Sequence, residues 1–234
     1  MSRLLIITFA LVGCGPPVTT VPDAGQWFDG DFAGCRIGGA APQSVDEIIA
    51  RINALPMPVS VACFTASLPR PLALVPTSSR FSAQPAGGAE DPRLFLFTGG
   101  AVLSIVTAGD GKDLLEVGEL VTPSRTLKAE FKFPVTAPIT REAGYAHLDY
   151  IPSSTTCGLC HSGEVAHPAH PMARVSLALR PPARTSVSLD SARRFASTCD
   201  RETQRDRCLR WASVFGFGDV VDGAFPPEFG DFIK

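Results

Sequence analysis

The sequence has little charge and no basic excess. Only 19% of its 234 residues are Asp, Glu, Lys or Arg, and the formal net charge is −2. Proteins that bind nucleic acids present a basic surface to the phosphates. The composition therefore argues against a nucleic-acid partner.

The sequence also lacks the motifs of common enzyme classes. It contains no Gly-x-Ser-x-Gly, no P-loop and no dinucleotide-binding fingerprint, so hydrolase and nucleotide-dependent activities have no support. Fifteen phenylalanines against two tyrosines indicate core packing rather than an aromatic platform for sugars or nucleotides. We assign no catalytic residue, and the sequence favours a carrier or binding protein over an enzyme.

What the chain does contain is apolar residues and residues typical of turns. Hydrophobic residues make up 45% of it, which is enough for a core. The 21 glycines and 21 prolines favour many turns over a helical bundle. The seven cysteines are an odd number, which requires an explanation in an exported protein.

The N-terminus has the pattern of an export signal. Arg3 precedes an apolar stretch, Leu4–Val12, which is shorter than the roughly 20 residues of a membrane span and has the length of a secretory signal. It runs into Leu11-Val12-Gly13-Cys14, which resembles the lipobox of bacterial lipoproteins. In that family the signal is cut before the cysteine, whose thiol carries lipid. The resemblance implies a signal peptide over 1–13, an acylated Cys14 and a tether over 14–26.

The lipoprotein resemblance also implies a location. Two or more acyl chains hold a protein stably on a membrane without a spanning helix. Gly15 stands where some inner-membrane lipoproteins carry an aspartate. We therefore expect Cys14 to anchor the chain in membrane lipid of the bacterial cell envelope, at the outer membrane rather than the inner one.

Residues 27–150 are expected to form a β-rich domain with one helix near its start. Ser44 and Glu47 form a capping-box pair, and apolar residues at helical spacing predict a helix over 44–55. Beyond it the clearest strand is Leu127–Phe133, where apolar residues alternate with Lys128, Glu130 and Lys132. No helices of about 10 to 15 residues separate the strands, which favours an antiparallel meander or small sandwich. The other predicted strands are Leu72–Val75, Leu94–Phe97, Ala101–Val106 and Leu114–Val121.

Residues 151–234 are expected to pack on the same body. The stretch 145–183 is predicted to be irregular, and short helices are predicted over Ser188–Cys199 and Arg201–Phe215. The predicted fold class is therefore α+β and β-rich, with an N-terminal helix and a C-terminal helical pair.

One motif carries identifiable chemistry. Cys157-Gly158-Leu159-Cys160-His161 is a C-x-x-C-H sequence and resembles the haem-attachment site of c-type cytochromes. In that family both thiols bond to the haem vinyl groups and the histidine coordinates the iron. Since haem is attached outside the cytoplasm, the motif and the export signal agree. The resemblance, which covers the motif alone, implies haem c bound covalently at Cys157 and Cys160, with His161 as axial ligand.

The motif leaves several alternatives open. A sixth iron ligand has two nearby candidates, Met172 and His170, and the site can equally be five-coordinate. Without haem, Cys157 and Cys160 could form a structural disulfide or a redox pair, although the βαβ context of a thioredoxin-like protein is missing. A zinc site that adds His167 and His170 is a further alternative, although its spacing is uncommon.

The remaining four cysteines can form two disulfides. Proximity along the chain favours Cys35–Cys63, which would join the predicted helix to the strand after it, and Cys199–Cys208. Nine residues of continuous helix rise about 13.5 Å, too far for a disulfide, so the second pair requires a bend near Asp200. One lipid anchor, two motif thiols and four bridged cysteines then account for all seven.

These patterns predict an envelope lipoprotein that carries one haem c. Its role would be electron transfer, with a redox partner protein, or haem-based binding. The competing prediction is a non-haem β-sandwich lipoprotein, an interaction or assembly module whose C-x-x-C-H is structural or holds metal.

Replacing Cys14 by Ser tests the lipid anchor. We expect Cys14→Ser to lose all label when cells are fed a radioactive fatty acid, because serine offers no thiol for acylation. Cys160→Ser is the matched control and should keep the label. Equal labelling of Cys14→Ser and the wild type would show that the lipobox resemblance is accidental.

Overall fold

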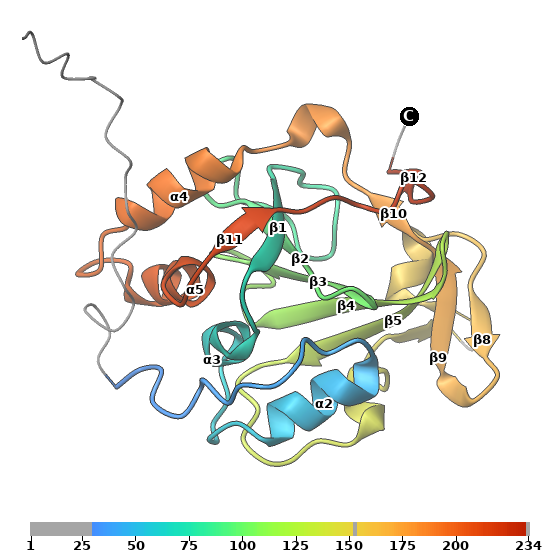
Figure 1. Cartoon of the computed structure of the whole chain (residues 1–234). Coiled ribbons are helices and arrows are strands. Elements are labelled where there is room, and N and C mark those ends of the chain that lie inside the picture. The colour runs from blue at the N-terminus through green and yellow to red at the C-terminus, as the bar shows by residue number, and fades with distance from the viewer. Residues whose placement is uncertain (1–29, 152–153, 233–234) are drawn as a thin grey trace, which may run out of the picture.

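The computed structural model describes residues 30–151 and 154–232. Its main element is an eight-stranded sheet of strand order β11-β1-β2-β3-β4-β5-β9-β8 (Figure 1). The strands are β1 (Leu72–Thr77), β2 (Arg93–Phe97), β3 (Ala101–Val106), β4 (Leu114–Thr122), β5 (Arg125–Lys132), β8 (Val165–His167), β9 (His170–Leu177) and β11 (Val220–Asp222). Two small sheets pair β6 (Asp149–Ile151) with β7 (Ser154–Thr155), and β10 (Leu179–Arg180) with β12 (Gly230–Asp231).

The helices lie near both ends of the described chain. They are α2 (Val45–Asn53), α3 (Val61–Ser67), α4 (Leu189–Ser197) and α5 (Arg205–Phe215), with short 3-10 helices η1 (Arg141–Gly144), η2 (Thr156–Leu159) and η3 (Ala183–Thr185). The fold is therefore α+β and strand-rich, with an N-terminal helix and C-terminal helices, as the sequence predicts. Among these described helices, none is both long enough and apolar enough to cross a membrane.

Strands β1 to β5 form the predicted antiparallel meander, because each pairs with the next along the chain. Glycines allow the tight turns between them. Gly99 and Gly109 have φ angles of 94° and 79°, which side chains other than glycine rarely adopt. The parallel pairing of β1 with β11 is an exception to the antiparallel pattern, and it brings the C-terminal region to the sheet edge.

One face of the sheet is covered by helices. Ser44 caps α2 by accepting a hydrogen bond from the backbone N–H of Glu47, and the side chains of Ile48 and Ile52 are fully buried. They belong to one apolar cluster with Leu127 of β5 and Trp211 of α5. Figure 1 shows α2 and α3 below the sheet.

The opposite face is covered by the C-terminal segment, which crosses the sheet after β11 (Figure 1). Phe225 packs edge-on against Phe95 of β2, with ring centroids 5.0 Å apart. Phe229 is buried in the same small cluster, together with Val102 and Ala178. Both faces of the sheet are therefore covered, one by helices and one by irregular chain.

The prediction of an irregular stretch over 145–183 is wrong. Strand β9 lies within it and pairs with β5, so that Val175 stands opposite Leu127. The strand begins at His170-Pro171, and prolines on both sides of it conceal the alternation in the sequence. This segment is a strand because it pairs with β5, which is distant in the sequence, and not because of a pattern in its own residues.

The expectation that the Cys35–Cys63 disulfide joins the helix to a strand is also wrong. Cys63 lies in α3, which Ser60 caps by accepting a hydrogen bond from the Cys63 backbone N–H at 3.0 Å. All seven residues of α3 are buried. A helix without a polar face has no helical periodicity in its sequence, so the pattern gave no signal.

Two disulfides lie within the described residues, and they are the pairs that proximity along the chain predicts. Cys35–Cys63 has a Cα–Cα distance of 5.2 Å, and Cys199–Cys208 one of 5.6 Å. The chain bends between α4 and α5 at Asp200, whose carboxylate accepts a hydrogen bond from Thr203 Oγ1 at 2.6 Å. The lipobox, Cys14 and the tether lie outside the described residues.

Ile52 tests the packing of α2 on the sheet. Ile52→Ala should lower the free energy of unfolding by about 2–5 kcal/mol, because it leaves a cavity in a fully buried position. Ile52→Val, the matched control, should cost about 0.5–1.5 kcal/mol. Denaturant unfolding measures both, and equal losses for the two variants would contradict this packing.

Candidate functional site

A cleft of about 140 Å³ lies on the sheet face opposite α2 and α3. Its floor is made by side chains of β2 to β5 that point away from the helices. The C-terminal segment and the chain around η2 form its walls. The floor residues include Arg93, Phe95, Val102, Ser104, Glu116, Thr126, Lys128 and Glu130, and the walls include Phe81, Thr156, Cys157, Cys160, His161, Arg180, Phe225, Phe229 and Phe232.

The C-x-x-C-H motif therefore opens into this cleft. Glu164 holds the chain before it, since its carboxylate accepts hydrogen bonds from Ser154 Oγ at 2.7 Å and from the Thr155 N–H at 2.8 Å. A side chain at Gly158 would overlap Ser154 and Glu164, which explains the glycine between the two cysteines. The motif begins as the 3-10 helix η2, and the His161 N–H closes the turn on the Cys157 carbonyl at 2.9 Å.

The ring of His161 is held in one orientation. Its Nδ1 lies 2.8 Å from the Leu177 carbonyl oxygen at the end of β9. Because a carbonyl oxygen can only accept, Nδ1 carries the proton and Nε2 keeps its lone pair. Burial, with a smaller effect from Lys128, lowers the pKa of His161 to about 4. The imidazole is therefore neutral at pH 7, the state in which histidine binds metals.

The two motif thiols are not bonded to each other. Cys157 is half-buried and Cys160 is exposed. Burial raises the pKa of the Cys157 thiol to about 11. A redox-active pair requires the opposite environment, one that lowers the pKa of the attacking thiol.

The candidate sixth ligands lie elsewhere. Neither Met172 nor His170 lines the cleft. His170 stacks on His167 at the turn between β8 and β9, with centroids 4.8 Å apart, and contacts Arg141. The zinc set that the sequence allows is not assembled, because no three His, Cys, Asp or Glu side chains within residues 30–151 and 154–232 are grouped closely enough to hold a metal ion.

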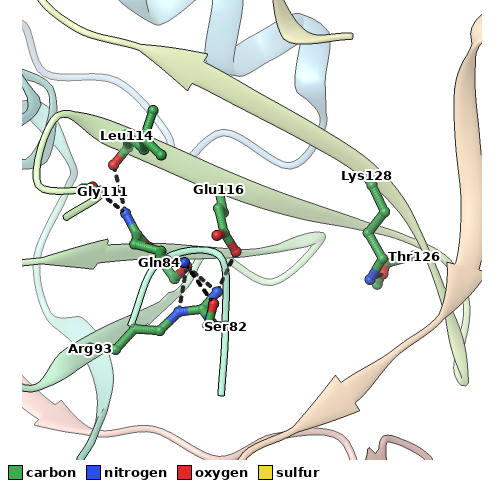
Figure 2. A network of polar contacts seen from close by, with 9 residues as sticks. Ser82, Gln84, Arg93, Gly111, Leu114, Glu116, Thr126 and Lys128 are labelled. Carbon is green, nitrogen blue, oxygen red and sulfur yellow. Dashed lines mark hydrogen bonds and ion pairs between the residues drawn. The ribbon is translucent and has the colours of Figure 1, made fainter. Parts of the chain in front are cut away.

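Sequence reasoning missed Lys128 as a site residue. Its polar position in the alternation of β5 was visible, but the chain that covers this face was not. Only 8% of Lys128 is exposed, and its Nζ donates a hydrogen bond to Thr126 Oγ1 on the same strand (Figure 2). Burial lowers the pKa of Lys128 to about 8.

A second polar group closes another side of the cleft (Figure 2). Arg93 forms an ion pair with Glu116 and donates a hydrogen bond to Ser104 Oγ at 2.8 Å. Ser104 donates in turn to Gln84 Oε1 at 3.0 Å, and the Gln84 amide is fixed by the Leu114 carbonyl at 2.9 Å. The hydrogen-bonding groups of these residues satisfy one another, which gives the cleft a rigid polar side.

Comparison with known proteins adds no relative. A scan against protein-family models, a search of the curated proteins and a search of the solved structures each found no match.

Lys128 should make stability depend on pH. Its pKa falls from an ordinary 10.5 to about 8 on folding. Between these values the unfolded chain holds a proton that the folded chain lacks, so stability rises with pH across this window. At pH 7 the buried charge costs about 3 kcal/mol. We therefore expect the free energy of unfolding of Lys128→Met, relative to that of the wild type, to be higher at pH 7 than at pH 10.5. The difference between the two pH values should be up to about 3 kcal/mol.

Denaturant unfolding at the two pH values measures this difference. Lys132→Met is the matched control, since Lys132 is the exposed last residue of the same strand, and it should show no comparable change with pH. A Lys128→Met effect that is equal at both pH values would contradict the buried charge.

Proposed function

We propose that this protein is a lipid-anchored protein of the bacterial cell envelope that carries one haem c. Cys157 and Cys160 would hold the haem covalently, and His161 would be its axial ligand. The observation that carries the proposal is the 2.8 Å hydrogen bond from His161 Nδ1 to the Leu177 carbonyl, beside two thiols that are not bonded to each other. The lipid anchor rests on the lipobox at Cys14.

This hydrogen bond is the kind that metal-binding histidines make. A ligand histidine donates its second ring N–H to a carbonyl or carboxylate, which fixes the tautomer and aims the other nitrogen at the metal. In His161 the other nitrogen is Nε2, and it has no hydrogen-bond partner among the described residues. The orientation and neutral state of the ring therefore suit binding of a metal through Nε2. A histidine with only a structural role would not need this nitrogen to be free.

The thiols fit the same interpretation. The other four cysteines of the described chain form disulfides, whereas Cys157 and Cys160 remain free at the cleft. Their 3-10 turn presents both to the cavity that His161 also lines. Haem, when bound, supplies the redox and ligand-binding chemistry. The chain supplies two attachment points and a neutral imidazole at the edge of the cleft.

Within this proposal the geometry favours haem-based binding over electron transfer. Met172 and His170 do not line the cleft with His161, so we expect the iron to have five ligands. An open coordination position is what a binding protein requires, whereas electron carriers such as the cytochromes c with Met and His ligands fill both axial positions. A redox role with a partner protein is the second possibility that the motif supports.

The alternative is a non-haem binding lipoprotein with a structural motif. One observation favours it: the cleft has polar and aromatic lining residues of its own, Lys128, Arg93 and Phe95 among them, outside the motif. The presence or absence of covalent haem separates the two functions.

The decisive experiment is expression of the full chain together with a cytochrome maturation system. We expect a Soret band and haem-stained protein that survives denaturation, because thioether bonds persist when the fold is lost. Replacing Cys157 and Cys160 together by Ala should abolish the stain. His147→Ala is the control, since His147 pairs with Glu130 at 2.8 Å and lies outside the motif.

An exported but colourless wild-type protein would overturn the haem proposal. If haem is bound, Met172→Ala and His170→Ala should leave the absorption spectrum unchanged. A spectral shift in either variant would identify that residue as a sixth ligand and contradict the five-coordinate site.

A further inference from the structure

Lys128 brings a positive charge into the cleft and has no salt bridge to any carboxylate in the described part of the chain; Glu116 and Glu164 act on it only from a distance. The other charged groups of the lining have partners: Arg93 pairs with Glu116, Arg180 with Asp231 at 2.7 Å, and Glu130 with His147 at 2.8 Å. Within the described chain, Lys128 Nζ has Thr126 Oγ1 as its hydrogen-bond partner and forms no ion pair. A lysine with so little exposure is rarely left without an anion.

The ammonium group has hydrogen-bonding capacity to spare. Lysine carries three N–H donors, and Thr126 accepts one. In Figure 2 the Lys128 side chain extends from β5 at a distance from the Arg93 network, and both line the cleft. A ligand could therefore reach Nζ without breaking the Arg93–Glu116 ion pair.

The rest of the lining limits the size and character of such a ligand. Phe95, Phe225 and Phe229 supply an aromatic wall next to Val102. The cavity measures about 140 Å³, close to the roughly 150 Å³ of an apolar cavity that holds benzene in another protein. Glu116 and Glu130 also line it and would repel a ligand with several negative charges.

We propose that this cleft binds a small monocarboxylate with an aromatic or compact apolar body, about the size of benzoate, and that Lys128 Nζ binds its carboxylate. One ligand charge matches one unpaired lysine, and the apolar body matches the phenylalanine wall. Burial of the Lys128 ammonium together with the ligand carboxylate strengthens the charge-assisted hydrogen bond between them relative to the same bond in water. The inference concerns the interior of the cleft and does not rest on the haem proposal.

Calorimetric titration of the full chain tests the proposal, with benzoate as the probe and benzyl alcohol as its neutral counterpart. Benzoate should bind, and benzyl alcohol should bind at least roughly tenfold more weakly, since a hydrogen bond to a charged group contributes about 1.5–3 kcal/mol. Lys128→Met and Lys128→Gln should reduce benzoate affinity by a similar factor and leave benzyl alcohol unaffected. Lys132→Met, an exposed lysine on the same strand, should bind benzoate like the wild type.

Both a colourless and a haem-loaded preparation are titrated, so that failure to bind haem leaves this test intact. Saturable benzoate binding to either preparation that is lost in the Lys128 variants supports the proposal. Absence of benzoate binding to both preparations overturns it, as does equal affinity for benzoate and benzyl alcohol. The comparison of the two probes on the wild type decides the question even if the Lys128 variants do not fold.

Discussion

The pairing of β9 with β5 is the contact on which the whole site depends. It sets Leu177 opposite Arg125 and returns the chain to the sheet, where the Ala178 N–H donates to the Ser124 carbonyl at 2.9 Å. The Leu177 carbonyl is then fixed as the acceptor for His161 Nδ1. Since β5 also carries Lys128, this one pairing brings together the motif, its orienting carbonyl and the buried ammonium.

The two faces of the sheet perform different tasks. Side chains alternate along a strand, so Leu127 enters the helix-covered core while Lys128 enters the cleft. The core face is mainly apolar, and its burial is the main stabilising contribution expected of this sheet. That surplus allows the other face to carry groups that are costly to bury, including the Lys128 ammonium and the Arg93–Glu116 ion pair. The pleat of the sheet thus separates the apolar core from the polar cleft.

The chemistry of the cleft follows from its charge states. The same burial that lowers the pKa of His161 to about 4 raises that of Cys157 to about 11. Histidine and the Cys157 thiol are therefore both uncharged at pH 7, and Lys128 is the cationic group beside them, with Glu116 and Glu130 also in the lining. A neutral imidazole and thiol beside one ammonium, with two carboxylates nearby, suit a small monoanion better than a ligand with several negative charges.

The sequence by itself determined the local features. Alternation over Leu127–Phe133, the Ser44 cap and cysteine spacing predicted the meander, α2 and the two disulfides, because each depends on neighbours along the chain. It also located the motif by its residues alone. Tertiary structure decided the rest. Strand β9 and the burial of Lys128 depend on partners that pack from distant parts of the chain, and α3 is buried on all sides. No local pattern records such contacts, so the sequence located the C-x-x-C-H motif but not the residues that surround it.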